Sequence, residues 1–242
     1  MSRFLRPQVT RFVVLFVERA GSTYLMSTLA SHPEIHALRE QFAVLRQQGT
    51  DAAGQLQWAR ELWTPPLIGE HAAIGFKTKL VDVLDPAGFA ALLREKQVRI
   101  IQLERRNAVK GVISTINARR LHEASGNWNL LQEADRMPPF AVDFDEFQRL
   151  LAVREEWDRE LEAFVSGLQL PTLPLCYEEL LEDENAFLRK VVDFLEAPER
   201  PVQGKTLKHT TDDLRQAITN FDELRARYAG ARYESMFDEV LA

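Results

Sequence analysis

The sequence is poor in cysteine, in long apolar runs and in excess positive charge. Its one cysteine, Cys176, leaves no partner for an internal disulfide, which fits a reducing cytoplasm. The longest apolar run, 12–17, is far too short to cross a bilayer, and the basic start "MSRFLRPQVTRF" lacks the apolar core of a secretion signal. The formal net charge of -6 argues against nucleic acid as the main partner.

What the sequence does contain is an alternation of strand and helix patterns. Valine-rich or alternating apolar segments predict strands, and segments with apolar residues every three or four positions predict helices. Their alternation predicts βαβ units, and therefore a three-layer α/β/α domain with a central parallel sheet and helices on both faces. The predicted strands are 12–17, 73–80, 98–103 and 172–177, and the predicted helices are 24–31, 85–97, 107–121, 144–167, 178–195 and 212–228.

The simplest domain division is a single domain over residues 1–242, because the chain has no repeat, no low-complexity tract and no linker. Two segments, about 40–70 and 122–142, interrupt the alternation. Long irregular excursions from a compact sheet often form walls or lids over a substrate. We therefore expect both segments to be irregular and to lie on the substrate side.

The segment "ERAGSTYLMSTLASHPEI" follows the first predicted strand and opens the first helix. A loop at the carboxyl end of a parallel strand that leads into a helix is an anion site, because the first helical N–H groups are unpaired. Gly21 lets the backbone approach a ligand, and Ser22 and Thr23 supply hydroxyl donors. Arg19 adds charge-assisted donors, so the pattern favours a phosphate group.

The same segment disagrees with the two common nucleotide-binding loops. A triphosphatase loop needs two glycines, the second followed directly by Lys-Ser/Thr, and the dinucleotide fingerprint needs several glycines. Neither pattern is present around Gly21. A Mg²⁺-dependent triphosphatase is therefore disfavoured.

With its flanking residues, the segment resembles the 5′-phosphosulfate loop of sulfotransferases. In that family a basic residue, a small residue, glycine and two Ser/Thr residues follow the first strand, and the next helix runs into His-Pro. Glu18 departs from the pattern, because many members have proline there.

A distant segment, "IIQLERRNAVKGVIS", resembles the 3′-phosphate motif of the same family, in which a serine follows an arginine by eight residues. Arg106 and Ser114 have this spacing, which is about two helical turns. Arg105 is the competing arginine, and the spacing favours Arg106. Two further segments, 175–198 and 206–237, resemble the bacterial carbohydrate and Nod-factor type of sulfotransferase, so the likeness covers most of the chain.

The resemblance implies 3′-phosphoadenosine 5′-phosphosulfate (PAPS) as the donor, transfer in line to an acceptor hydroxyl, and no metal. The residues that it implies for donor binding are Arg19, Ala20, Gly21, Ser22, Thr23, Tyr24, Arg106, Ser114 and Lys208, with Lys205 as the alternative lysine. Arg19 would also stabilise the charge that develops on the leaving phosphate.

An alcohol acceptor must lose a proton during attack, so a base is expected. Glu40 is the first candidate, because the resemblance implies a glutamate in this neighbourhood. His36 is the alternative, since an imidazole has a suitable unperturbed pKa. Lys77 is expected at the carboxyl end of a central strand, where it can donate to the sulfuryl group or the acceptor.

The sequence does not identify the acceptor. A carbohydrate or glycolipid hydroxyl is the first expectation from the resemblance, with a small metabolite, a phenol or a peptide tyrosine as alternatives. Trp128 and His122 lie in the irregular segment and suggest contact with a sugar ring, although a tryptophan more often packs in a core. A kinase-like phosphotransferase and an inactive nucleotide-binding module are the competing functions.

Overall fold

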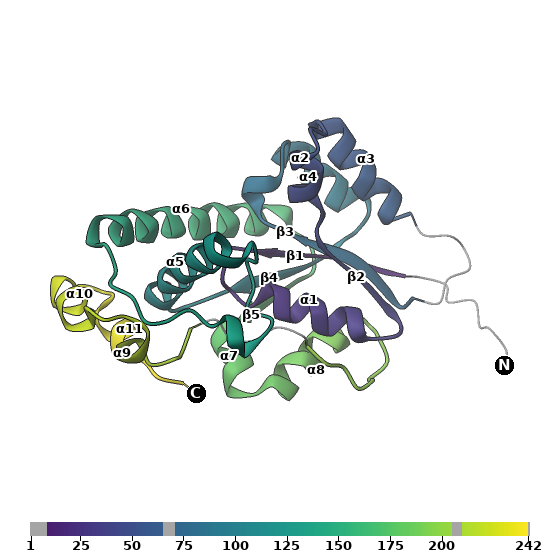
Figure 1. The fold of residues 1–242 in the computed structure, drawn as a ribbon. Helices are drawn as coiled ribbons and strands as arrows, with labels where there is room; N and C mark the ends of the chain where they lie inside the picture. The colour runs from purple at the N-terminus through teal and green to yellow at the C-terminus, as the bar shows by residue number, and fades with distance from the viewer. Residues whose placement is uncertain (1–8, 65–70, 205–209, 242) are drawn as a thin grey trace.

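The computed structural model describes residues 9–64, 71–204 and 210–241. Its centre is a five-stranded sheet in the order β2-β3-β1-β4-β5, and every neighbouring pair of strands is parallel (Figure 1). The strands are β1 (Thr10–Phe16), β2 (Ile35–Glu40), β3 (Ala73–Thr78), β4 (Arg99–Glu104) and β5 (Thr172–Cys176). The predicted parallel sheet is thus confirmed.

Both faces of the sheet are covered, because alternate side chains of the buried strands point to opposite sides. Phe12 and Val14 of β1 join one core with α1 (Ser22–Ser31), α7 (Tyr177–Glu182) and α8 (Glu184–Phe194). Val13 and Leu15 join the core on the other face. That face carries α2 (Gln41–Gln47), α3 (Ala52–Leu62), α4 (Pro86–Glu95) and the end of α6 (Phe144–Leu168). Figure 1 shows these two layers below and above the sheet, which confirms the three-layer arrangement.

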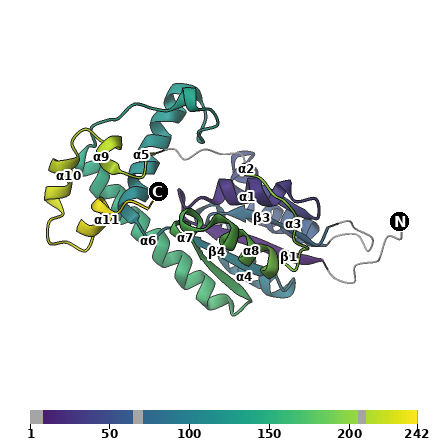
Figure 2. The ribbon, with the colours of Figure 1, turned by 90° about the horizontal axis from the view of Figure 1, so that it is seen from below.

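A third apolar core lies beyond the edge of the sheet. It joins α5 (Ala108–Ser125) and the start of α6 to three short C-terminal helices, and Val112, Phe147 and Phe237 are buried in it. The short helices are α9 (Leu214–Ala217), α10 (Phe221–Arg227) and α11 (Glu234–Asp238). Figure 2 shows them beside α5, away from the strands. A buried ion pair between Lys110 Nζ and Asp212 Oδ2, 2.8 Å long, ties this segment to the start of α5.

The strand register brings the functional candidates to the carboxyl ends of the strands. Lys77 on β3 lies opposite Glu40 at the end of β2. β1 and β4, which lie between β3 and β5, end at Phe16 and Glu104. Ligands bind outside the carboxyl ends of the strands in such sheets.

Several predicted boundaries were wrong. The segment from 40 was expected to be irregular, but its described part forms α2 and α3 over the sheet. Residues 122–142 are irregular only after Ser125, apart from a 3₁₀ turn at Glu133–Asp135. The predicted helix 178–195 is broken at Asp183, whose side chain accepts a hydrogen bond from the N–H of Ala186 and caps α8. Within the described ranges, no helix is long and apolar enough to span a membrane.

Candidate functional site

The turn between β1 and α1 has an unusual backbone. Arg19 has φ 65° and Gly21 has φ 80°, both in the left-handed region. For a non-glycine residue this conformation costs roughly 1–2 kcal/mol. Gly21 meets a second restriction, because a Cβ atom there would lie 2.6 Å from Cδ2 of Tyr177. The turn therefore needs glycine at position 21 for its backbone and for the packing of Tyr177.

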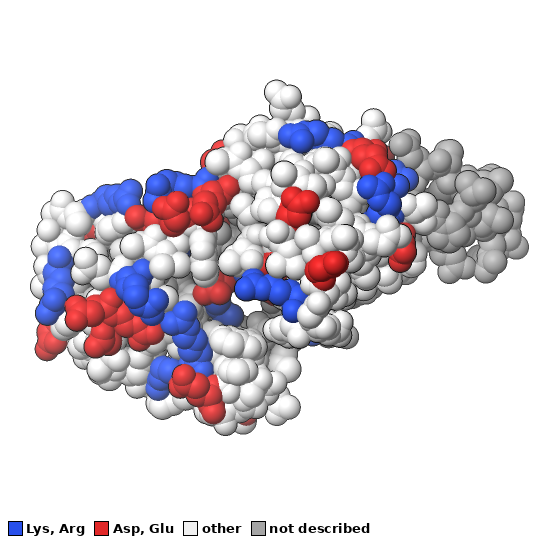
Figure 3. Space-filling model, turned by 90° about the horizontal axis from the view of Figure 1, so that it is seen from above, with Lys and Arg blue, Asp and Glu red and all other residues white. Residues whose placement is uncertain are grey.

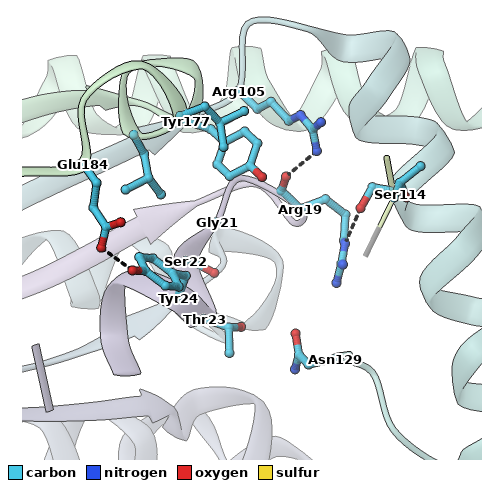
Figure 4. Close-up of a pocket in the computed structure, with 13 residues that line it drawn as sticks. Arg19, Gly21, Ser22, Thr23, Tyr24, Arg105, Ser114, Asn129, Tyr177 and Glu184 are labelled. Atoms are coloured by element: carbon cyan, nitrogen blue, oxygen red, sulfur yellow. Dashed lines mark hydrogen bonds between the residues drawn. The ribbon is translucent and has the colours of Figure 1, made fainter. Parts of the chain in front are cut away.

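A cavity opens in front of this turn. The residues that line it come from the turn, from α1, from α5 and the loops on both sides of it, from α7 and α8, and from the segment before α9. They are Arg19, Gly21, Ser22, Thr23, Tyr24, Arg105, Ser114, Asn129, Tyr177, Leu180, Leu181, Glu184 and Thr210. The Arg19 side chain points into the space between Ser114, Thr23 and Asn129 (Figure 4). The structure thus brings together six of the predicted donor-binding residues: Arg19, Gly21, Ser22, Thr23, Tyr24 and Ser114.

Arg19 is a partly buried cation that lines this cavity. Its Nε donates a hydrogen bond of 3.0 Å to Oγ of Ser114, 95 positions away in the sequence. Burial, together with the nearby charge of Arg105, lowers the pKa of Arg19 to about 10. The guanidinium is therefore still charged at neutral pH. A cation fixed at a helix start is a suitable partner for a phosphate.

The two neighbouring arginines after β4 point in different directions. Arg105 lines the cavity, donates a hydrogen bond of 3.1 Å to the carbonyl of Arg19, and lies over the ring of Tyr177. The Arg106 side chain is 61% exposed and faces Glu178 and Glu182 at 4.0 and 3.9 Å. The structure therefore does not bring Arg106 to the cavity, although the spacing favoured it over Arg105.

A buried carboxylate occupies the start of α5. Glu178 accepts hydrogen bonds from the backbone N–H groups of Arg106 and Asn107, at 3.1 and 3.0 Å. Burial alone would raise the pKa of Glu178, but hydrogen bonds from Cys176 and from these N–H groups outweigh burial and lower it. The thiol of Cys176 therefore has a structural contact, as a hydrogen-bond donor to Glu178.

Lys77 links the start of α1 to Glu40. Its Nζ donates to Oγ of Ser22 at 3.1 Å and to Oγ1 of Thr23 at 2.9 Å, and it forms an ion pair of 3.0 Å with Oε1 of Glu40. The Lys77 side chain is only 2% exposed, and this desolvation lowers its pKa, against the opposing effect of Glu40. Glu40 itself is partly exposed. Lys77 thus connects the hydroxyls of Ser22 and Thr23 to the Glu40 carboxylate, which solvent can reach.

His36 lies elsewhere on the same strand. It is paired with Ile74, whereas Glu40 is paired with Lys77. Four residues of a strand span roughly 13 Å. The His36 ring lies 5.3 Å from that of His71, and burial followed by the effect of His71 lowers its pKa. The structure does not bring His36 to the loop, so Glu40 is the better candidate base.

Some expected residues contribute differently, or lie outside the described residues. Ala20 is fully buried in the core below the loop. Lys205 and Lys208 fall in the range 205–209, outside the described residues. Among the described residues, no group of three or more His, Cys, Asp or Glu side chains is placed to hold a metal ion.

The sequence did not single out several lining residues that come from distant segments. Asn129 follows Trp128, whose carbonyl accepts a hydrogen bond of 3.4 Å from Arg19. The Trp128 ring stacks on His122, 4.2 Å between centroids, and 52% of Trp128 is exposed. Glu184 reaches the cavity through a hydrogen bond from the Tyr24 hydroxyl. Burial, followed by this bond, raises the pKa of Tyr24 to about 12.

One face of the molecule carries charges of both signs. Seen from above, basic and acidic side chains lie next to one another, and side chains of both signs border a hollow near the middle of this face (Figure 3). A surface of mixed sign does not attract an extended polyanion. The positive charge at the cavity is therefore local and comes from Arg19 and Arg105.

Comparison with known proteins agrees with the fold. No family model matches the chain. Nodulation protein H from Rhizobium tropici is 24% identical over 96% of this chain and 94% of its own length, and the protein of the same name from Rhizobium meliloti is 26% identical over 94% of each. A sulfotransferase crystal structure from Alicyclobacillus acidocaldarius superimposes with a TM-score of 0.50 at 17% identity, over 97% of this chain and 98% of that one. The resemblance found in the sequence is confirmed: this chain has the sulfotransferase fold and is a distant homologue of Nodulation protein H over nearly its full length.

Proposed function

We propose that the protein is a sulfotransferase that moves a sulfuryl group from PAPS to an acceptor hydroxyl. One observation carries the proposal. Arg19 and Ser22, where β1 leads into α1, line one cavity together with Ser114, which lies 95 positions after Arg19 in the sequence, and this cavity lies at the carboxyl ends of the parallel strands. A cation and hydroxyls at a helix start suit a phosphosulfate. The fold and the distant homologues support the same enzyme class.

In this reaction the protein positions the reactants and stabilises developing charge. Negative charge builds on the oxygen that bridges sulfur and the leaving phosphate. Arg19 and the first N–H groups of α1 are the donors that would stabilise it. Because the leaving phosphate is already a stable anion, the step asks for electrostatic stabilisation and alignment more than for covalent chemistry.

Glu40 is the proposed base. The acceptor hydroxyl loses its proton as it attacks sulfur, and the carboxylate of Glu40 takes that proton. Lys77 contacts Glu40 and the hydroxyls of Ser22 and Thr23. It therefore fixes the position of the base relative to the donor loop and adds positive charge beside the transferred group.

The acceptor proposed first is a carbohydrate or glycolipid hydroxyl. The likeness to carbohydrate and Nod-factor sulfotransferases supports it, as does the half-exposed Trp128 beside Arg19, since an aromatic face suits a sugar ring. A small metabolite, a phenol and a peptide tyrosine are the acceptors to test against it.

Two measurements test the function. Adenosine 3′,5′-bisphosphate should raise the unfolding temperature, because a ligand that binds only the folded state stabilises it. Labelled PAPS should transfer its sulfate to at least one member of a screen of sugars, glycolipids, phenols and peptides. No thermal shift at millimolar nucleotide and no transfer would reject the proposal. Protection by Mg²⁺-ATP alone would instead favour a phosphotransferase.

The base is tested by Glu40→Gln. We expect kcat to fall by about 10²–10⁴-fold, the usual contribution of a positioned base, with nucleotide binding retained. Glu61→Gln is the matched control, because Glu61 lies exposed on α3 and contacts Gln57. Nucleotide binding without turnover in the unchanged protein would identify an inactive binding module.

A further inference from the structure

Arg154, in the middle of α6, is a buried cation with few partners. Its Nη1 donates a hydrogen bond of 2.9 Å to the carbonyl of Glu18, and its Nε lies 3.6 Å from Oδ2 of Asp158. Within the described residues, Nε and Nη2 are buried without a hydrogen-bond partner. Burying a charge with incomplete hydrogen bonding is unfavourable. A favourable effect on another part of the protein should therefore offset this free-energy cost.

The neighbouring helix α5 is shaped to admit this side chain. A Cβ atom at Gly111 would lie 2.6 Å from Nη1 and 2.8 Å from Cζ of Arg154. Glycine inside a helix is less stable than alanine, so the helix loses stability to make this space. One turn further along, Thr115 donates a hydrogen bond of 3.1 Å to Oε1 of Glu18. Glu18 is thus held at its carbonyl by α6 and at its carboxylate by α5.

The hydrogen bond from Arg154 to the carbonyl of Glu18 constrains the backbone of the next residue, Arg19. Glu18 precedes Arg19, which has the left-handed backbone, and the carbonyl of Arg19 is held by Arg105. Two successive carbonyls of the turn, those of Glu18 and Arg19, therefore each accept a hydrogen bond from an arginine side chain. A strained non-glycine conformation persists only where the surroundings fix it, and strain of this kind gathers at ligand sites.

We propose that Arg154 is a positioning residue for the donor loop. It is not among the described residues that line the cavity, and it acts through the carbonyl of Glu18. By fixing this peptide it keeps Arg19 left-handed, with its guanidinium beside Ser114 and facing the cavity. The inference rests on the proposed function, because the group that Arg19 meets is then the 5′-phosphosulfate of the donor.

Two nucleotides separate this role from a general effect on folding. Adenosine 3′,5′-bisphosphate has the 5′-phosphate that the loop would hold, and adenosine 3′-monophosphate lacks it. Arg154→Met should weaken binding of the bisphosphate about tenfold or more, the effect expected when a charge-assisted hydrogen bond is lost. Binding of the 3′-monophosphate should stay within twofold of the unchanged protein.

Gly111→Ala gives the same test without removing the arginine. The new methyl group displaces the Arg154 guanidinium, while alanine favours the helix, so this variant should fold even if Arg154→Met does not. The matched controls are Arg159→Met, at an exposed position of α6, and Gly167→Ala, where a Cβ atom meets nothing within 4 Å. Both controls should leave both nucleotides unaffected.

The outcomes are distinct. A selective loss of bisphosphate binding in Arg154→Met or Gly111→Ala supports the positioning role. Equal losses for both nucleotides, or no loss in either variant, would overturn it while leaving the proposed function intact. If the unchanged protein binds neither nucleotide, the proposed donor is wrong and this role falls with it.

Discussion

Replacing Gly21 by alanine tests the packing of the turn between β1 and α1. The left-handed backbone adds roughly 1–2 kcal/mol for an alanine. The new Cβ atom also meets the Tyr177 ring at 2.6 Å, and overpacking of this kind adds about 1–3 kcal/mol. The free energy of unfolding should therefore fall by roughly 2–5 kcal/mol. At about 2–4 °C per kcal/mol for a chain of this size, the unfolding temperature should fall by roughly 4–20 °C.

Gly49→Ala separates the two contributions. Gly49 has φ 79°, almost the same as Gly21, but a Cβ atom there meets nothing within 4 Å. This control should show the backbone cost alone, roughly 1–2 kcal/mol. In a Tyr177→Ala background, the cost of Gly21→Ala should fall toward the control value. Thermal and urea unfolding measure all of these variants. Equal destabilisation by Gly21→Ala and Gly49→Ala would refute the packing argument.

The remaining predictions concern individual side chains. Arg105→Met should weaken binding of adenosine 3′,5′-bisphosphate, measured by calorimetry, at least about tenfold. Arg106→Met should have little effect on this binding. The reverse result would make Arg106 the ligand of the 3′-phosphate. Lys77→Met should lower kcat by about 10²–10³-fold with little loss of stability, because the carboxylate that it leaves behind, Glu40, is 33% exposed and lies 3.9 Å from Lys79. Unchanged kcat would remove Lys77 from the reaction. The pKa of His36 is lower in the folded protein than its ordinary 6.5. The unfolded chain therefore binds more protons just below pH 6.5, so stability should rise with pH up to that value and then level off. His36→Asn should flatten this rise in urea unfolding and leave the pH profile of kcat unchanged; an altered kcat profile would make His36 the base.

Much of the sheet could be predicted from the sequence, because β1, β3 and β4 are buried on both faces and read as apolar segments. β2 could not. It lies at the edge of the sheet, and "IHALRE" mixes one fully buried residue with partly exposed ones. Such an edge strand lacks the continuous apolar pattern that identifies an inner one. Its pairing with β3, visible only in three dimensions, places Glu40 beside Lys77.

The limits of sequence reasoning at the site have a different cause. The spacing of Arg106 and Ser114 is a property of the chain, but the direction of an arginine after a strand depends on how the chain turns into the next helix. Arg105 faces Tyr177, and Arg106 turns out toward Glu182. The break at Asp183 was hidden for a similar reason, because the apolar periodicity continues on both sides of it. Only the capping hydrogen bond to the N–H of Ala186 reveals the new helix start.

The carboxylate of Glu178 has a consequence for how a ligand with two phosphates is held. At the start of α5, the N–H groups of Arg106 and Asn107, just before the helix, donate to Glu178, and the Asn107 side chain accepts from the N–H of Lys110. The start of α1 faces the cavity with Gly21, Ser22 and Thr23. A bound bisphosphate would therefore meet main-chain donors chiefly at the start of α1. Substitution of single side chains would then change the affinity for the 3′-phosphate. Affinity for the 5′-phosphate would depend instead on the backbone conformation of the turn between β1 and α1.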